Sequence, residues 1–397
     1  MASFFSIQDA AAVPNGYLKY TVPLNASPTG LAFDPSGDLY VLEAASFLSN
    51  TAQIRVIHSD NTFGTDITVT GNDPNNFFAG GMTYDPISDG LLITDNTADG
   101  RLYSVSKTGV QQTLAIGIST IADVAVRSTG EIFVSTAFGD NLGTVLQIDR
   151  LPDPTPPPTP VVSGLDFGGG LAFDAAGNLL ILEADANSVT GRLRRLSITE
   201  GTSGLQFGSL SLLVDGIQSF FGMTLDSEED IFTTGSGGLF SVDGLPLSEA
   251  PFDNNGNPSQ FATAVAFDSG ALPFEPFLGA DAGRLAFGSN FSDPFVTLVR
   301  PTPPIDANFN ADGNVDQEDL QIWQPHFGTT ITATNAQGDS DGDFDVDGSD
   351  FLNWQRQFGA GSLATQLLSV PEPASSALFV GLLWQATRLG RRGRLDR

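Results

Sequence analysis

The sequence predicts an all-β six-bladed β-propeller, then a small α-helical EF-hand-like domain and a C-terminal transmembrane helix. A strand–turn–strand pattern recurs six times before residue 300, two acidic twelve-residue loops lie between residues 308 and 350, and an apolar stretch precedes arginines at the C-terminus. The 397 residues exceed one ordinary domain, and 44 Gly and 24 Pro indicate many turns rather than long helices.

The repeated unit is clearest in GLAFDPSGDLYVLEA at residues 30–44. It recurs at 81–95 and 170–184, with weaker copies at 122–136, 222–235 and 262–270. Each copy is typical of an apolar strand, a tight turn and a second apolar strand. Equivalent apolar residues lie 42 to 52 residues apart, the length of a four-stranded propeller blade; they are Leu31, Met82, Val124, Leu171, Met223 and Val265.

The ring needs one more strand to close. The sixth unit has no fourth strand after residues 293–300, whereas residues 17–23 have strand character and precede the first hairpin. We expect 17–23 to close blade six, so that the propeller takes residues 1–300. The units also repeat at an offset of 140 or 141 residues, which predicts two three-blade halves; the proline-rich run at 152–160 between them is a stiff connection or a plain linker.

The hairpins resemble NHL-type six-bladed propeller repeats, most closely over Pro28 to Val41. That resemblance implies a binding scaffold more often than an enzyme. Carboxylates end three of the second strands, at Glu43, Asp95 and Glu183. Because Glu43 and Glu183 are related by the half-repeat, we expect them to face each other across the ring, where they could bind a cation or a basic ligand; the alternative is solvated loop acids.

A lactonase is the enzymatic alternative. Gluconolactonase-type propellers also place a metal in the channel, with Glu, Asn and Asp ligands from different blades. Asn96, Asn141 and Asn290 are loose candidates for such ligands, without a residue-by-residue match to that family's motifs.

Two segments, NFNADGNVDQED at 308–319 and DSDGDFDVDGSD at 339–350, match at an offset of 31 residues. Calcium takes about six to eight oxygen ligands, which such a loop supplies from its first, third, fifth, seventh, ninth and twelfth positions. The sequence therefore predicts two Ca²⁺ sites. The first comprises Asn308, Asn310, Asp312, the carbonyl of Asn314, Asp316 through water, and Asp319; the second comprises Asp339, Asp341, Asp343, the carbonyl of Asp345, Asp347 and Asp350.

Each loop opens a helix, and aromatic residues repeat at the same offset. We expect Trp323, Trp354, Phe327 and Phe358 to form the small core of this module. The pattern over residues 306–360 resembles dockerin domains of the type I-like kind, which implies a calcium-dependent module with a cohesin-like protein partner. The alternatives are a purely structural calcium module and an acidic linker.

Two residues depart from the pattern. Phe344 stands where the first loop has the turn residue Gly313, so we expect the second loop to be strained and to bind calcium more weakly. Pro325 interrupts the first helix, so we expect its later turns to be lost. The module takes residues 308–361, between a proline-rich linker at 301–307 and a second linker at 362–369.

The C-terminal segment, residues 370–397, combines Pro371, Glu372 and Pro373, an apolar stretch, and arginines that include Arg388, Arg391, Arg392 and Arg394. It resembles a PEP-CTERM sorting signal. The resemblance implies an exosortase-like processing enzyme, a transient membrane anchor, and export to the cell envelope or extracellular matrix of a bacterium. The apolar stretch is shorter than the roughly 20 residues of a full span, so a dimerising amphipathic helix is the alternative.

The N-terminus shows no secretion signal, because residues 1–18 have neither a basic start nor a long apolar core. Since the tail requires export, we expect the true start codon to lie upstream of Met1; the alternative is that the upstream stretch was lost.

Composition excludes several function classes. A formal net charge of −29, from 46 acids and 17 bases, disfavours nucleic acid as a partner. The absence of cysteine excludes disulfides, zinc–thiolate sites and cysteine nucleophiles. His58 and His326 are far apart and lack the partners of a Ser-His-Asp triad.

The leading hypothesis is an exported, cell-surface or matrix-associated, non-catalytic binding or scaffold protein with a calcium-dependent module. One alternative is a metal-dependent lactonase-like hydrolase in the propeller channel. Another is a propeller delivered to a cohesin-type assembly for polysaccharide handling. The ligand of the propeller is not written in the sequence.

Overall fold

The chain consists of two compact units, Met1–Pro304 and Ile305–Arg397. A computed structural model describes residues 6–7, 17–43, 50–59, 62–73, 77–137, 143–150, 157–184, 190–202, 204–217, 222–225, 231–235, 238–241, 262–268, 284–289, 294–301, 305–330 and 333–360. The predicted sorting signal at 370–397 lies outside these residues. Among the residues described, no helix has the length and apolar character needed to cross a membrane.

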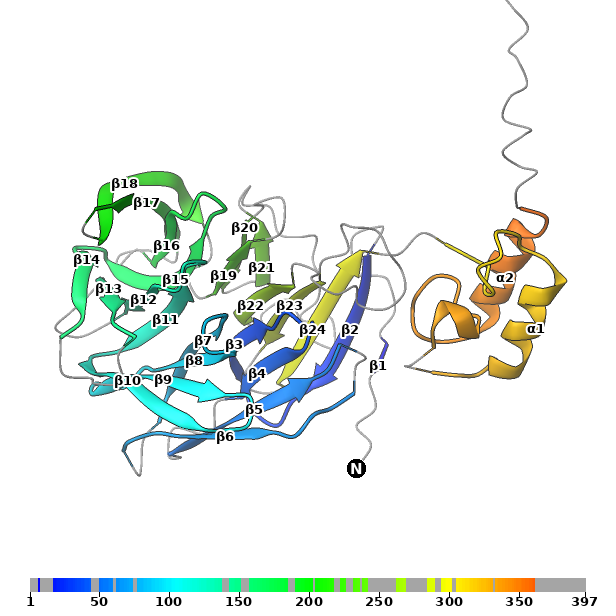
Figure 1. Cartoon of the computed structure of the whole chain (residues 1–397), viewed down its shortest axis with the longest axis horizontal. Helices are drawn as coiled ribbons and strands as arrows, with labels where there is room; N and C mark the ends of the chain where they lie inside the picture. The colour runs from blue at the N-terminus through cyan, green and yellow to red at the C-terminus, as the bar shows by residue number, and fades with distance from the viewer. Residues whose placement is uncertain are drawn as a thin grey trace, which may run out of the picture. The chain divides into compact units, whose positions relative to one another are not determined.

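The described strands of the first unit form six antiparallel sheets, which we number as blades 1 to 6 (Figure 1). Blade 1 is β3 (Pro28–Phe33), β4 (Leu39–Glu43), β5 (Thr51–Ile57) and β6 (Ile67–Thr70); blade 2 is β7 (Ala79–Asp85), β8 (Gly90–Asp95), β9 (Gly100–Ser106) and β10 (Gln111–Ile118); blade 3 is β11 (Ile121–Val126), β12 (Ile132–Thr136), β13 (Val145–Ile148) and β14 (Thr159–Val162). Blade 4 is β15 (Phe167–Phe173), β16 (Leu179–Ala184), β17 (Gly191–Gly201) and β18 (Gly204–Ile217); blade 5 is β19 (Met223–Leu225), β20 (Ile231–Gly235) and β21 (Gly238–Ser241).

Blade 6 joins the two ends of the propeller sequence. It is β22 (Ala262–Asp268), β23 (Arg284–Ser289), β24 (Phe295–Pro301), β2 (Tyr17–Pro23) and the short β1 (Ser6–Ile7). β2 pairs with β24 along its whole length, from Tyr17 opposite Pro301 to Pro23 opposite Phe295, and the blue and yellow strands lie side by side in Figure 1. The N-terminal strand thus covers an edge that would otherwise be open to pairing with another chain.

The first strand of each blade lies on the inside of the ring. These inner strands are β3, β7, β11, β15, β19 and β22; each contacts the next, and β22 contacts β3. The prediction of an all-β propeller is therefore confirmed. The proline-rich run at 152–160 is only partly described, and its last residues belong to β14, where Pro160 pairs with Leu146.

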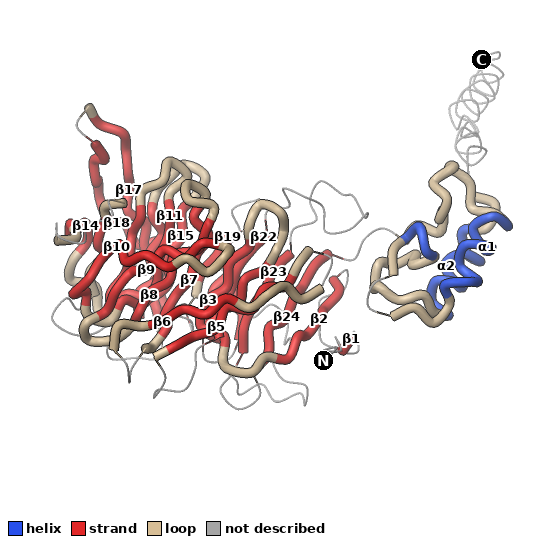
Figure 2. The backbone as a smooth tube through the Cα atoms, turned by 60° about the horizontal axis from the view of Figure 1, so that its bottom comes forward, coloured by secondary structure: helices blue, strands red, loops and turns tan. Residues whose placement is uncertain are grey.

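Apolar side chains fill the space between neighbouring blades. One cluster joins Leu42 and Ile54 of blade 1 to Ile93 and Val105 of blade 2, and all four side chains are buried. The strand sequences are rich in Val, Ile and Leu on both faces because each blade is covered by neighbours on both sides. The long hairpin of β17 and β18 extends beyond the other strands in Figure 2.

Ion pairs join successive blades at the tight turns. Asp34 of blade 1 lies 2.8 Å from Lys107 of blade 2, and Asp85 of blade 2 receives two 2.7 Å bonds from Arg150 of blade 3. In blade 3 the turn residue is Arg127 instead of Asp, and it pairs with Glu200 of blade 4. At the third turn the base lies on the turn and the acid on the next blade, which is the reverse of the first two turns. An ion pair still joins the two blades.

The Asp85–Arg150 pair is expected to carry measurable stability. Burial would raise the pKa of Asp85, but hydrogen bonds from Arg150 and Ser88 outweigh it and hold that pKa below its ordinary value. Arg150→Ala leaves a buried carboxylate without its partner and should cost about 3 kcal/mol, whereas Asp85→Asn should cost about 1 kcal/mol. Urea unfolding at pH 7 measures both.

The control for this prediction is Asp99→Asn, since Asp99 is exposed and lies 3.8 Å from Arg101; it should change stability by less than about 0.5 kcal/mol. Because the pKa of Asp85 is lowered on folding, its contribution is present above about pH 4 and is lost as the pH falls further. Equal losses for Arg150→Ala and Asp99→Asn would contradict the role of the pair.

The second unit is built from two α-helices, α1 (Gln317–His326) and α2 (Gly348–Gln357), with a 3₁₀ turn, η2, at Asn335–Gln337 (Figure 2). The helices are equal in length. Pro325 does not shorten α1 as expected from the sequence, because it lies in the last turn, where its missing N–H removes only one helical bond.

The two halves of this unit make reciprocal contacts. The indole N–H of Trp354 donates to the carbonyl of Asp316 at 2.8 Å, and that of Trp323 donates to the carbonyl of Asp347 at 3.1 Å. The core around Trp354 contains Ala307, Phe309 and Val315. Phe327 and Phe358, expected in this core, are instead more than half exposed, and each ring packs against the tryptophan one helical turn before it.

Candidate functional site

The two acidic loops are held by the aspartates at their twelfth positions. Asp319 accepts the N–H groups of Phe309 at 2.7 Å and Asp316 at 2.8 Å. Asp350 accepts those of Ser340 and Asp347, both at 2.7 Å. Both carboxylates are fully buried, so each loop is closed onto the start of its own helix.

The fourth and sixth residues of each loop have left-handed backbone conformations. In the first loop these are Ala311 and Gly313, with φ of 56° and 88°; in the second they are Gly342 and Phe344, with φ of 71° and 68°. The strain predicted at Phe344 is therefore present in the backbone. Its side chain is buried, however, and this burial offsets the conformational cost.

Carboxylates converge in the second loop. Asp339, Asp341 and Asp343 can bring one oxygen each within 4.8 Å of one another, and so can Asp345, Asp347 and Asp350. Two of these oxygens, Asp341 Oδ1 and Asp345 Oδ1, are buried and have no hydrogen-bond partner. Asp345, expected to act through its carbonyl, thus also brings a carboxylate to the loop.

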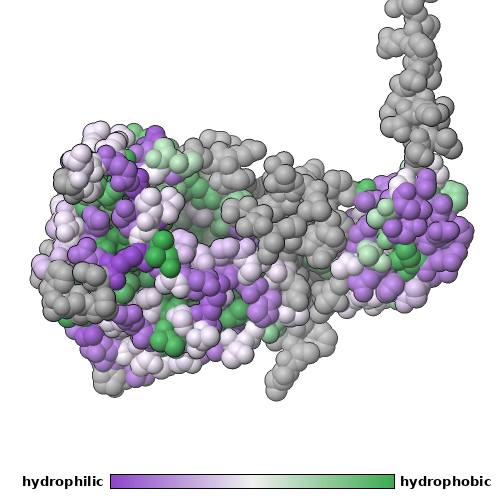
Figure 3. Space-filling view, in the orientation of Figure 1, coloured by the Kyte–Doolittle hydropathy of each residue, from purple (hydrophilic) through white to green (hydrophobic). Residues whose placement is uncertain are grey.

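Burial and mutual repulsion raise the pKa values of these groups. The pKa of Asp339 is raised to about 8, first by burial and then by Asp343 and Asp350. Burial and neighbouring aspartates likewise raise the pKa of Asp341 and Asp345 to about 7. A cation would remove this cost, so the residues present fit a calcium ion. The visible face of the second unit, which contains both acidic loops, is mostly hydrophilic, as Figure 3 shows.

The first loop carries less charge. Asn308 and Asn310 each accept the N–H of Asp312, at 3.1 and 3.0 Å, and Asp312 accepts that of Asn314 at 2.8 Å. These bonds aim the side-chain oxygens toward the inside of the loop. The predicted ligand positions are thus folded into one loop, although with fewer carboxylates than in the second.

The propeller carboxylates singled out in the sequence do not meet across the ring. Glu43 is paired with Arg55 at 2.8 Å and accepts two main-chain N–H groups, from Asn25 and Ala26. Glu183 is paired with Arg194. The expectation of a shared cation site is wrong, because each glutamate is neutralised by an arginine on the third strand of its own blade.

Asp95 also has hydrogen-bond partners of its own. Burial raises its pKa to about 6, against hydrogen bonds from Thr97 and Phe78. None of Glu43, Asp95 and Glu183 lines the central pocket, whereas Asn96 does. Asn141 and Asn290 lie outside the described residues.

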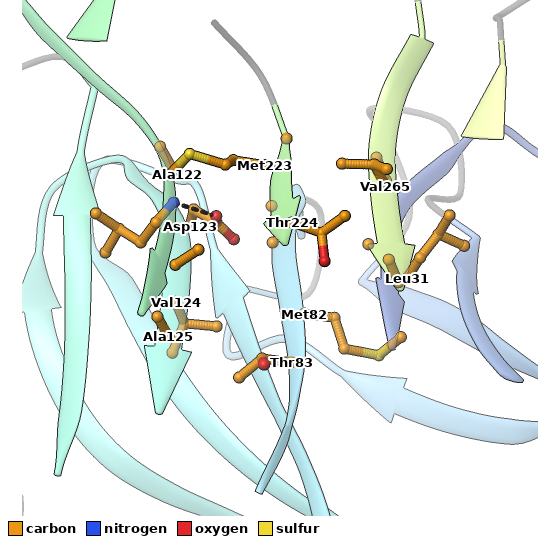
Figure 4. A pocket seen from close by; sticks show the side chains of 18 of the residues that line it. Leu31, Met82, Thr83, Ala122, Asp123, Val124, Ala125, Met223, Thr224 and Val265 are labelled. Carbon is orange, nitrogen blue, oxygen red and sulfur yellow. Dashed lines mark hydrogen bonds between the residues drawn. The ribbon is translucent and has the colours of Figure 1, made fainter. Parts of the chain in front are cut away.

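The central channel forms a pocket of about 760 Å³ lined by all six inner strands (Figure 4). Equivalent residues of the six repeats build its wall in layers. One layer is Leu31, Met82, Val124, Leu171, Met223 and Val265; two residues further along each strand the layer is Phe33, Tyr84, Val126, Phe173, Leu225 and Phe267. The wall is therefore largely apolar and aromatic.

Asp123 is the exception in this wall. The preceding layer contains Gly30, Gly81, Gly170, Gly222 and Ala264, but Asp123 in the third repeat. Figure 4 shows its carboxylate between β11 and neighbouring strands, where Oδ2 accepts the N–H of Leu171 at 2.8 Å. A Cβ atom at Gly81 would overlap Oδ1, so the glycine makes room for the carboxylate.

The sequence analysis missed Asp123, although a signal existed. An acid stands at a repeat position where four other copies have glycine and one has alanine. Burial raises its pKa to about 7, opposed only by hydrogen bonds from the N–H groups of Leu171 and Val124. The carboxylate therefore changes charge near neutral pH.

The described channel residues do not fit a metal ion. Asp123 is the one carboxylate among the pocket-lining residues, and Asn96 is the other side chain of a type common among hard-metal ligands. No group of three acidic or histidine ligands occurs in the described part of the propeller.

No family model matches the sequence, and no curated protein matches it. Among solved structures, a gluconolactonase from Xanthomonas campestris has 16% identity and a TM-score of 0.52, over 75% of this chain and 95% of that chain. A luciferin-regenerating enzyme has 13% identity and a TM-score of 0.49, over 70% and 92%. A PQQ-bound aldose sugar dehydrogenase from Streptomyces coelicolor has 16% identity and a TM-score of 0.47, over 75% and 99%. At 16% identity, the similarity to the gluconolactonase shows the β-propeller fold alone.

Phe344 gives a test of strain against packing. Phe344→Gly removes a left-handed conformation that costs about 1–2 kcal/mol, but it also removes a buried aromatic side chain worth about 3–5 kcal/mol. We expect a net loss of about 2 kcal/mol. Tryptophan fluorescence during thermal unfolding measures it, because Trp323, Trp354 and Trp384, the three tryptophans, all follow the propeller.

Ala311→Gly is the matched control, since Ala311 has the same backbone conformation and an exposed side chain. It should stabilise the unit by about 1 kcal/mol. A stabilising Phe344→Gly would show that strain, rather than packing, dominates the second loop.

Proposed function

We propose that residues 305–360 form a calcium-binding module with one ion in each acidic loop. The observation that carries this is the pair of buried, unpartnered oxygens, Asp341 Oδ1 and Asp345 Oδ1, within clusters of converging carboxylates. Such oxygens are costly in a folded protein unless a cation satisfies them. The ligands are those predicted from the sequence, with the carboxylate of Asp345 as an added oxygen in the second loop.

Calcium binding should stabilise the module. At a calcium concentration about 100 times the dissociation constant, one site adds about 2.7 kcal/mol to the free energy of unfolding. Titration calorimetry of the full chain should give two ions per chain, and Asp341→Asn should reduce this to one. Removal of calcium by a chelator should lower the midpoint of the tryptophan-detected transition.

Glu318→Gln is the control, because Glu318 is an exposed acid of α1 and is not a predicted ligand. It should leave the stoichiometry at two. A stoichiometry of zero in the unaltered chain would refute the module's assignment.

For the propeller, the second candidate function is a lactonase-like hydrolase acting in the channel. Two observations favour it over a non-catalytic scaffold. The fold is shared with a gluconolactonase at a TM-score of 0.52, and the channel wall carries Asp123, a carboxylate whose pKa near 7 suits a general base.

In this reaction Asp123 would accept a proton from water as the water oxygen attacks the lactone carbonyl. The same proton would then pass to the ring oxygen as the acyl–oxygen bond breaks, which opens the ring to a hydroxy acid. The layer that contains Leu31 and Met82 and the layer that contains Phe33 and Tyr84 would exclude bulk water. The described channel does not fit a metal, so the step relies on the carboxylate alone.

Hydrolysis of δ-gluconolactone, followed by acid release, tests this function. Asp123→Asn should lower kcat by about 100-fold or more, because the amide cannot accept the proton. The activity of the unaltered chain should survive a chelator and should fall below about pH 7, where Asp123 becomes protonated.

The exposed Asp99→Asn variant should keep full activity. No hydrolysis above the uncatalysed rate by the unaltered chain, or equal rates for the chain and Asp123→Asn, would reject the hydrolase and favour a binding function.

The remaining sequence-based hypotheses stay part of the proposal. The tail with Pro371, Glu372 and Pro373 would direct export and processing by an exosortase-like enzyme, and calcium is plentiful outside cells. A cohesin-like partner would then bind the module at the cell envelope. Pull-down with the full chain, with calcium and with chelator, tests the partner.

A further inference from the structure

Asp123 lies in the channel without a positively charged neighbour among the described residues. Its hydrogen bonds come from the main-chain N–H groups of Leu171 and Val124. A main-chain N–H is a partial charge and does not neutralise a carboxylate in an apolar cavity. The channel therefore contains a negative charge that the chain itself leaves largely uncompensated.

The bases in the described part of the propeller either have acidic partners or belong to strands other than the inner ones. No lysine or arginine occurs in any of the six inner strands. Arg55, Lys107, Arg150 and Arg194 are paired with Glu43, Asp34, Asp85 and Glu183. Lys19, Arg284 and Arg300 belong to β2, β23 and β24, which follow the inner strand in blade 6.

The segments of residues 1–304 that lie outside the described residues cannot supply a base either. Their sequences contain no lysine, arginine or histidine, while many contain aspartate or glutamate. This follows from composition alone.

The wall around Asp123 suits an apolar molecule. The pocket is lined by methionine, leucine and valine side chains and by aromatic rings, including Phe33, Tyr84 and Phe173. Its volume of about 760 Å³ is in the range of sites for small organic ligands. Aromatic faces also attract organic cations.

We propose that the channel binds a small organic cation, an apolar molecule with a protonated amine, whose ammonium group pairs with the carboxylate of Asp123. The inference rests on the proposal that the channel is the working site of the propeller, and it names the class of ligand. An inorganic cation fits less well, because calcium requires about six to eight oxygens and the described wall offers few. An anion would meet the carboxylate of Asp123 and no base among the described lining residues.

Calorimetry with three probes of similar shape tests this inference: 2-phenylethylamine, 2-phenylethanol and 3-phenylpropanoate. The full chain with calcium, at pH 8, should bind the amine at least about tenfold more tightly than the alcohol, a difference of about 1.4 kcal/mol, and should not bind the carboxylate. Amine affinity should fall below about pH 7 as Asp123 takes up a proton.

Asp123→Asn should remove the preference for the amine while leaving alcohol binding unchanged. Asp123→Gly, which restores the residue of most other repeats, is a second variant with the same expected result, and Asp99→Asn is the control that keeps the preference. Thermal unfolding verifies that each variant is folded.

Equal binding of amine and alcohol, a preference that survives both Asp123 variants, or no binding of the amine at millimolar concentration would overturn the inference. The amine-binding test and the lactone-hydrolysis test can fail independently of each other. Amine binding without lactone hydrolysis would reject the hydrolase and keep the ligand class, whereas hydrolysis without a preference for the amine would do the reverse.

Discussion

The pairing of β2 with β24 is the constraint on which the propeller depends. Seven consecutive residues, from Tyr17 to Pro23, complete the last blade with sequence from the beginning of the unit. A propeller has no central core of its own, since each blade is stabilised by its two neighbours. Closing the ring therefore gives the first and last blades the same two-sided burial as the others, and it brings β22 against β3.

The channel and its one carboxylate follow from this closure. Asp123 accepts the N–H of Leu171 on the next blade and fits against Gly81 on the preceding one, so three blades must be in place before its environment exists. At the position of Asp123, four of the other repeats have glycine, which leaves space beside the channel. Only the third repeat has an acid at this position. Such a departure from an otherwise regular pattern is expected where function, rather than packing, selects the residue.

Much of the fold could be predicted from the sequence because hairpins and loops are local. The strand–turn–strand copies, the strand at 17–23 and the two acidic loops each depend on residues close together in the chain. The role of Glu43 and Glu183 could not be predicted in the same way. Their partners, Arg55 and Arg194, lie on the third strand, and only the pairing register shows which side chains meet. Phe327 and Phe358 were misplaced for a related reason, because a helical repeat fixes their spacing but not which face the other helix covers.

Two kinds of carboxylate in this chain differ in their partners. Asp34 and Asp85 have a base from the next blade, and hydrogen bonds from that base lower their pKa values despite burial. Asp123, Asp339 and Asp341 have none, and burial raises theirs to about 7 or 8. A group of the second kind is stabilised only by a proton or by a cation from solution. In the second loop six carboxylates form two groups of three, which suits a hard metal ion. In the channel one carboxylate faces apolar walls, which suits an ammonium group on an apolar body. Both sites contain carboxylates without a basic partner. They suit different cations because the second loop offers many oxygens and the channel offers one carboxylate.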